Sequence, residues 1–156
     1  MPLKNYTSSV PANKSICHIE TTLAKNGATQ VLKEYDPLGN VSALSFSINA
    51  HIGGGDSTRL DFKLPVKLAE CEKILRSQRT RNAQPHTLKK IPAQAERTAW
   101  KILSDWVDAQ MALLQIKQVE LAQVFVAFLV CDRTGKTLYE LAKDNGFKKM
   151  LPSGGS

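Results

Sequence analysis

The sequence predicts an α+β fold, with an N-terminal helix, a three-stranded antiparallel meander, and then helices that include one long buried helix. Apolar residues recur at helical spacing before residue 26, alternate with polar residues between residues 29 and 64, and return to helical spacing after Pro65. Short turn signals separate the alternating segments, which favours hairpin connections and one solvated sheet face. A chain of 156 residues that is 42% apolar can bury one core without disulfides or metal ions.

The N-terminal part predicts a loose lead followed by a helix. Residues 1–10 are mostly polar. A helix is expected over residues 11–25, because Pro11 suits the first helical turn and Gly27 suits the C-terminal cap. Three apolar residues share the inward face of this helix: Ile16, Ile19 and Leu23.

Three strands are predicted over residues 29–35, 41–50 and 59–64. Residues 36–40 form a strong turn signal, because proline fixes φ and glycine tolerates a positive φ. Residues 53–56, with three glycines, predict a flexible loop. The alternation predicts an inward face on the last two strands, made of Leu44, Phe46, Ile48, Leu60, Phe62 and Leu64.

The second half of the chain reads as helical. Pro65 ends the third strand, and a helix is predicted up to residue 78, so that residues 11–78 hold helix, sheet and helix. Residues 79–92 lack apolar periodicity, contain two prolines and predict a basic loop. Residues 93–150 are expected to form a helical part that packs on the same core.

The long helix predicted over residues 93–117 carries two adjacent apolar stripes. The first stripe is Trp100, Leu103, Val107, Met111 and Leu114, and the second is Ile102, Trp106, Ala109, Leu113 and Ile116. A helix on a protein surface needs only one apolar stripe. We therefore expect this helix to be covered on two sides, by the sheet, by later helices or by another subunit.

Shorter elements follow the long helix. Residues 120–130 are predicted to be helical, with a strand as the alternative. A turn at residues 132–135 leads into a last helix over residues 137–143, and residues 151–156 predict a flexible tail.

The whole net charge of +7 lies in residues 73–101. This segment holds eight basic residues and one acidic residue, whereas the segments before and after it each contain equal numbers of both. A concentrated positive field can recruit a polyanion. The charge pattern therefore indicates a partner more directly than the overall composition does.

No catalytic motif is complete, so the protein is not predicted to be an enzyme. Gly135-Lys136-Thr137 resembles the end of a phosphate-binding loop, but the glycine that this motif needs five positions earlier is Val130. The three histidines lack the paired spacing of zinc sites, and no metal or cofactor is predicted. Asp105 and Asp108 could pair as carboxylates, although a solvated helix strip explains them better.

Composition also predicts where the protein resides. Cys17, Cys71 and Cys131 lie among apolar residues, which predicts buried thiols and no disulfide framework. No apolar run approaches the roughly 20 residues that span a bilayer, and the N-terminus has no signal-peptide pattern. A cytoplasmic location without membrane contact is expected.

The basic segment predicts contacts with phosphate groups of a nucleic acid. The candidate contacts are Arg76, Arg79, Arg81, Lys89 and Lys90, with Arg97 and Lys101 as lesser candidates. The alternative is a solvated basic loop without a specific role. No aromatic residue for base stacking lies between Lys73 and Ala99, and Tyr35 is the candidate stacking residue on the sheet.

Several runs of the sequence resemble a family of small uncharacterised bacteriophage and prophage proteins. They cover residues 9–20 and 27–36, residues 95–112 of the long helix, and residues 124–125 with 137–140. The resemblance implies a phage-related intracellular context and carries no activity or site residues. The order of helix, three antiparallel strands and helix also resembles double-stranded-RNA-binding domains, and three strands followed by a helix resemble single-strand annealing proteins, at the level of fold alone.

These observations predict an accessory protein that binds nucleic acid, with single-stranded DNA favoured, through residues 73–101. The rival hypothesis is a protein-interaction module or regulator that uses the apolar helix 93–117, either with a second copy of the chain or with another protein.

Overall fold

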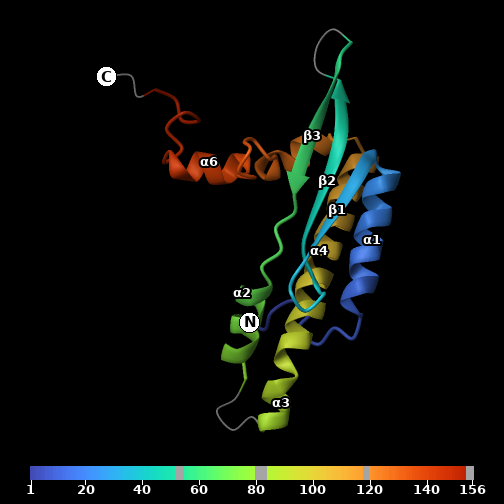
Figure 1. The fold of residues 1–156 in the computed structure, drawn as a ribbon, viewed down its shortest axis with the longest axis vertical. Helices are drawn as coiled ribbons and strands as arrows, with labels where there is room; N and C mark the ends of the chain where they lie inside the picture. Colours follow the sequence, from blue (N-terminus) through green and yellow to red (C-terminus); the bar gives the residue numbers. More distant parts are fainter. Residues whose placement is uncertain (52–54, 80–83, 118–119, 154–156) are drawn as a thin grey trace.

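The computed structural model describes residues 1–51, 55–79, 84–117 and 120–153, and it confirms the predicted α+β fold. Its elements, in chain order, are α1 (Ala12–Lys25), β1 (Ala28–Tyr35), β2 (Val41–His51), β3 (Ser57–Lys63), α2 (Leu68–Ser77), α3 (Pro85–Lys89), α4 (Ile91–Gln115), α5 (Leu121–Phe125), the short 3-10 helix η1 (Val126–Phe128) and α6 (Leu138–Asp144). The strands form one sheet in the order β1-β2-β3, and α1 and α4 pack together along it (Figure 1).

The sheet is an antiparallel meander whose register places aromatic side chains in its centre. Phe46 of β2 lies opposite Val31 of β1 and Phe62 of β3. The rings of Phe46 and Phe62 stack at 5.1 Å, and Phe125 of α5 meets Phe46 edge-on at 5.0 Å. All three rings are buried, so the inward face predicted from the period of two is the face that meets the core.

The turn between β1 and β2 has the chemistry that its sequence predicts. One carboxylate oxygen of Asp36 accepts hydrogen bonds from the backbone N–H groups of Leu38 and Asn40, both at 2.9 Å. Gly39 has a φ of +84°, which a side chain at that position would disfavour. The turn is therefore held by its own residues, and the pairing of β1 with β2 has an irregularity beside it, between Glu34 and Tyr35.

The first apolar stripe of α4 is its buried side. Trp100, Leu103, Val107 and Met111 pack with α1 and the sheet in the main core. The second stripe is only half covered, because Trp106 meets the edges of Phe125 and Phe128 while Ala109 and Ile116 remain exposed. The first stripe is therefore covered as expected. The second stripe is covered only in part, by α5 and η1.

Residues 1–10 differ from the loose lead expected from their polarity, because they are bonded to α4. The Thr98 hydroxyl donates to the Asn5 carbonyl at 3.0 Å, and the Gln94 side-chain amide donates to the Ser8 carbonyl at 3.1 Å. Polar side chains of α4 thus satisfy backbone carbonyl groups of residues 1–10. Local sequence patterns do not reveal such contacts, because the partners lie far apart in the chain.

The basic loop predicted over residues 79–92 contains two helical pieces. Pro85 opens α3 at a position where its missing N–H costs no hydrogen bond, and α4 begins at Ile91, two residues earlier than predicted. Ile91 is completely buried against α2, and this contact anchors the early start. Residues 80–83 lie outside the described residues.

Buried thiols were expected at all three cysteines, and this is wrong for two of them. Cys71 is buried, whereas Cys17 and Cys131 are exposed. Cys17 follows the inward-facing Ile16 by one residue, and one residue turns a helix by about 100°. Apolar neighbours in sequence are therefore not neighbours in space on a helix.

The C-terminal part begins with helix rather than strand, but both predicted alternatives occur in part. Residues after α4 form α5 and η1, and residues 129–130 then add a short antiparallel bridge to the outer edge of β3. α6 extends away from this edge in Figure 1. No helix among the described residues is long and apolar enough to cross a membrane.

The aromatic cluster predicts a large cost for Phe46→Ala. Truncation removes the ring that contacts both Phe62 and Phe125, and the free energy of unfolding should fall by about 3–5 kcal/mol in urea titrations. Leu32→Ala is the control, because Leu32 is 60% exposed on the same sheet and should change stability by less than about 0.5 kcal/mol. Equal losses in the two variants would contradict this packing.

Candidate nucleic-acid interface

Helix α2 holds the first basic side chains of the candidate interface because its apolar face fixes its rotation. Cys71 and Leu75 are buried against the start of α4. The opposite side of α2 therefore presents Lys73 and Arg76 to solvent, where both are exposed.

Both of these side chains have an acidic partner on the same helix. Arg76 donates to Glu72 at 2.7 Å, and the ammonium group of Lys73 lies 3.8 Å from Glu70. Such exposed pairs contribute only about 0–1 kcal/mol in water. Their cations can therefore exchange a carboxylate for a phosphate at small cost.

Three further basic residues follow α2 and lie close to it in the fold. Arg79 comes directly after the end of α2, Lys89 ends α3, and Lys90 joins α3 to α4. All three side chains are exposed. Within the described residues, no acidic side chain lies within ion-pair distance of any of them.

These five residues share one end of the molecule, which we call the basic end: Lys73, Arg76, Arg79, Lys89 and Lys90. In Figure 1, the end of α2, α3 and the start of α4 lie together, opposite the hairpin that joins β2 to β3. Arg81, predicted as a further contact, lies outside the described residues.

Of the lesser predicted contacts, Arg97 bonds to the N-terminal segment, and Lys101 bonds to a carboxylate, Asp105, that holds the same segment. The guanidinium group of Arg97 donates to the Ser8 carbonyl at 3.3 Å and to the Gln94 side chain at 2.6 Å. Lys101 pairs with Asp105 at 2.7 Å. Arg97 lines a hollow with Thr7 and Ser8 of the N-terminal segment, and Lys101 lies one turn further along α4, so the structure does not gather these two residues with the basic end.

Asp105 is the acidic centre of this N-terminal contact. Besides Lys101, it accepts a hydrogen bond from the Asn5 side chain at 2.9 Å and lies 3.3 Å from the ammonium group of Lys4. Burial would raise the pKa of Asp105, but the hydrogen bonds from Lys101, Asn5 and Lys4 outweigh burial and lower that pKa to about 2.

Asp105 and Asp108, the two carboxylates one turn apart on α4, bond to different parts of the chain. Asp105 bonds to the N-terminal segment, whereas Asp108 bonds to His18 of α1 at 2.7 Å. Each carboxylate thus has its own partners, and the two do not form an acid–base pair. Within the described part of the chain, no three histidine, cysteine or acidic side chains gather as a metal-ligand group.

Residues 135–137 form a turn that opens a helix. Asp132 accepts backbone hydrogen bonds from Thr134 at 2.9 Å and Lys136 at 3.0 Å, and Thr137 caps α6. The Lys136 ammonium group pairs with Asp144 at 2.7 Å. These contacts make residues 132–137 a turn that leads into α6, and the exposed Lys136–Asp144 pair joins this turn to the end of that helix.

The uncovered sheet face carries a polar cluster rather than a row of aromatic residues. The Ser47 hydroxyl donates to Asp61 at 2.6 Å, and Arg59 donates to the same oxygen at 2.8 Å. The hydrogen bond from Ser47, followed by that from Arg59, holds the pKa of Asp61 below its usual range. Tyr35, the candidate stacking residue, is 61% exposed at the end of β1.

Sequence reasoning did not locate an apolar groove that the described residues form between α2 and α4. The groove has a volume of about 460 Å³, and its lining includes Val66, Cys71, Ile74, Ile102, Trp106 and Phe128. Ile102 and Trp106 belong to the second stripe of α4. That stripe predicted an apolar surface on α4. The residues of α2 that complete the groove could not be predicted, because they depend on how the two helices pack.

The chain matches no protein-family model, no curated protein and no solved structure. The resemblance to bacteriophage proteins therefore stays a prediction.

The contacts of Asp105 with Lys4, Asn5 and Lys101, which we call the anchor, predict that the free energy of unfolding depends on pH. Because folding lowers the pKa of Asp105 from 3.8 to about 2, its contribution is complete above about pH 4 and is lost as the pH falls towards 2. Asp105→Asn should lower the free energy of unfolding by about 1–2 kcal/mol at neutral pH, and its difference from the wild type should shrink through that window.

The matched control is Asp108→Asn, on the same helix. Asp108 is half exposed and pairs with His18, itself half exposed, so its substitution should cost less than about 0.5 kcal/mol. Urea titrations at several pH values measure both variants. A constant difference between Asp105→Asn and the wild type from neutral pH to about pH 2 would show that the anchor does not act through its charge.

Proposed function

We propose that the protein binds nucleic acid through the basic end, with single-stranded DNA as the favoured ligand. The observation that carries the proposal is the gathering of five exposed cations at one end of the molecule, three of which lack an acidic partner among the described residues. An exposed cation without a carboxylate is ready to contact phosphate.

The helices at the basic end modulate this charge. The backbone dipole of α4 places partial positive charge at its N-terminus, beside Lys89 and Lys90. The C-terminus of α2 has partial negative charge, which Arg76 and Arg79 offset. Part of the basic character of α2 is therefore explained by helix stability. Lys89 and Lys90, the last residue and the C-terminal cap of α3, can offset the C-terminus of that short helix in the same way, so the proposal depends on the five cations together.

The small size of the basic end favours a single strand. The five cations come from the last turns of α2, the residue after its C-terminal cap, the five-residue helix α3 and the residue that joins α3 to α4. A flexible strand can bend to place successive phosphates on such a compact surface, whereas a duplex presents its phosphates at fixed spacing.

Protein docking is the second candidate function, and the groove between α2 and α4 favours it. Ile102 and Trp106 line the groove from the second stripe of α4, and Ile74 of α2, 39% exposed, lies opposite. An apolar hollow bounded by two helices is the usual seat for a helix or short apolar segment. This candidate does not involve the basic end.

The proposal predicts that the triple variant Arg79→Ala, Lys89→Ala, Lys90→Ala binds a fluorescent single-stranded oligonucleotide more weakly than the wild type. Fluorescence anisotropy from about 50 to 300 mM salt should give a plot of log affinity against log salt whose slope is shallower by about 2, because each lost phosphate contact removes about 0.7. Duplex DNA and heparin serve as comparison ligands.

The matched control is the triple variant Lys14→Ala, Lys25→Ala, Lys148→Ala. These lysines are exposed, lie away from the basic end on α1 and after α6, and their loss lowers the net charge equally. The control should keep the wild-type slope. If both triple variants lose affinity equally, binding follows net charge and not the basic end; if the wild type does not bind at low salt, the proposal is wrong.

The variant Arg97→Ala tests whether Arg97 contributes to the stability of the fold or to phosphate binding. Because Arg97 holds the Ser8 carbonyl and Gln94, its loss should reduce the free energy of unfolding by about 1 kcal/mol and leave the salt slope unchanged. Circular dichroism in urea and the same anisotropy titration measure the two quantities. A shallower slope with unchanged stability would place Arg97 among the phosphate contacts.

A further inference from the structure

A hollow in the surface of the basic end holds an aromatic ring that comes from a distant part of the chain. The hollow lies between the first residues of the chain and the end of α2, and its volume is about 390 Å³, within the range of ligand sites. The ring belongs to Tyr6, which is 45% exposed. We call this site the Tyr6 hollow, and its lining residues are Met1, Pro2, Tyr6, Leu75, Gln78 and Arg79.

Hydrogen bonds hold the N-terminal side of the Tyr6 hollow in place. The Gln78 side-chain oxygen accepts from the backbone N–H of Leu3 at 3.3 Å, and the Gln78 side-chain nitrogen donates to the Met1 carbonyl at 3.4 Å. Figure 1 shows the N-terminal end of the chain beside α2. Next to Tyr6, Asn5 bonds to two side chains of α4. The backbone on the N-terminal side of the ring is therefore fixed before a ligand binds, which lowers the entropy cost of binding.

The lining of the Tyr6 hollow fits a nucleobase that is joined to a phosphate. An aromatic ring offers a face on which any base can stack, and Pro2 and Leu75 add apolar walls. The charged side chain at the hollow is Arg79, which has no acidic partner among the described residues. A guanidinium group binds phosphate through several donors. An aromatic ring and a cation in one hollow are the combination that single-strand binding uses.

Two other exposed tyrosines lack this combination. Tyr139 lines a hollow that also contains the side chains of Glu34 and Glu140, whose carboxylates repel phosphate. Tyr35, the stacking residue predicted from the sequence, lies at the end of β1 and not among the cations of the basic end. Tyr6 is therefore the tyrosine best placed to meet a base whose phosphate is already bound.

We propose that one base of a bound single strand enters the Tyr6 hollow and stacks on the Tyr6 ring, while a neighbouring phosphate contacts Arg79. The inference rests on the proposed binding of single-stranded DNA and adds the group that recognises a base. It also gives a reason for the preference for a single strand, because a base in a duplex is paired and stacked and would have to leave its partner to enter the hollow.

Fluorescence anisotropy with two ligands of equal charge tests the inference on the full chain. One ligand is an oligothymidylate of about 12 nucleotides, and the other is an abasic oligonucleotide of the same length, which keeps the phosphates and lacks the bases. The wild type should bind the oligothymidylate more tightly, by about 5-fold or more. Tyr6→Ala should weaken binding of the oligothymidylate by about 5- to 100-fold and leave both the abasic affinity and the salt slopes unchanged.

Two further substitutions at the same position separate stacking from folding. Tyr6→Phe keeps the ring and should retain the wild-type affinity for the oligothymidylate. Tyr6→Leu fills the hollow without a ring and should bind as weakly as Tyr6→Ala. Circular dichroism in urea establishes that each variant is folded.

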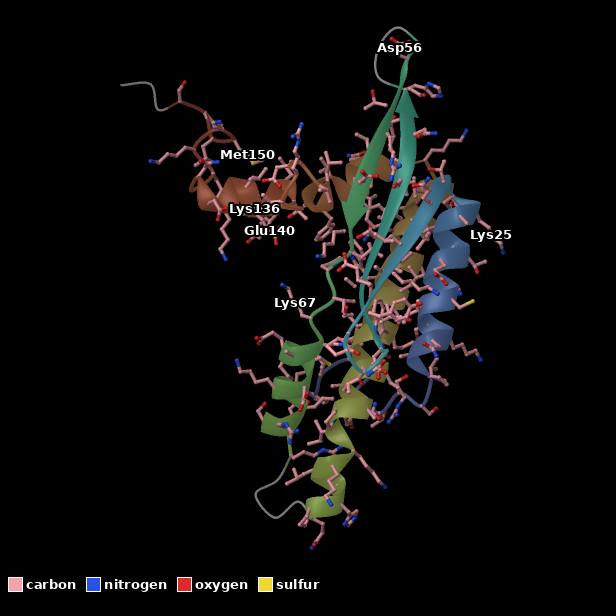
Figure 2. All side chains as sticks on the ribbon, viewed as in Figure 1. Lys25, Asp56, Lys67, Lys136, Glu140 and Met150 are labelled. Atoms are coloured by element: carbon pink, nitrogen blue, oxygen red, sulfur yellow. The ribbon has the colours of Figure 1, made fainter. Side chains whose placement is uncertain are left out.

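The matched control is Tyr139→Ala, which removes a tyrosine that is 52% exposed on α6. Figure 2 shows that Glu140, the residue next to Tyr139, lies on the sheet side of Lys67, whereas α2 lies on the other side of Lys67. The control should keep the wild-type affinity for both ligands.

The inference would be overturned by equal affinity of the wild type for the two ligands, by an unchanged preference in Tyr6→Ala, or by the same loss in Tyr139→Ala. Salt-dependent binding of both ligands would then still support the proposed phosphate contacts. A loss of abasic affinity in Tyr6→Ala would also overturn it, because the ring would then support the basic end without contacting a base. A wild type that binds neither ligand at about 50 mM salt would remove the proposed function and the inference together.

Discussion

The burial of one side of α4 against α1 and the sheet is the constraint on which the rest of the structure depends. Trp100 and Val107 are completely buried on this side. With the rotation of α4 fixed by these contacts, its first turns can hold α2 through Ile91, and its polar residues can hold the N-terminal segment through Thr98. Three separate parts of the chain thus take their positions from one helix, and the loss of its packing would release all three.

The same helix sets the relation between the two candidate surfaces. Lys90 lies at its start and Trp106 near its middle, so the basic end and the groove share a support of 25 residues that is about 37 Å long. A rigid helix holds the two surfaces at a constant separation.

The sequence predicted the elements that depend on residues close together in the chain. It did not predict side-chain roles that depend on residues far apart in the chain. The inward face of β2 followed from alternation, and the turn at Gly39 followed from its residue types. The roles of Arg97 and Asp105 did not follow, because their partners lie about ninety and one hundred residues away in the chain. The charge count correctly indicated a basic segment but could not separate Lys90, which is open to solvent, from Lys101, which holds Asp105.

The bonds of the N-terminal segment have a consequence for the order in which the chain assembles. Asn5 is joined to Thr98 and Asp105, partners 93 and 100 residues away in the sequence. During synthesis the segment emerges well before these partners, which follow it in the chain by 93 and 100 residues. Contacts between residues so far apart form slowly, because a long loop must close first. The segment therefore reaches its native position only after α4 has been made.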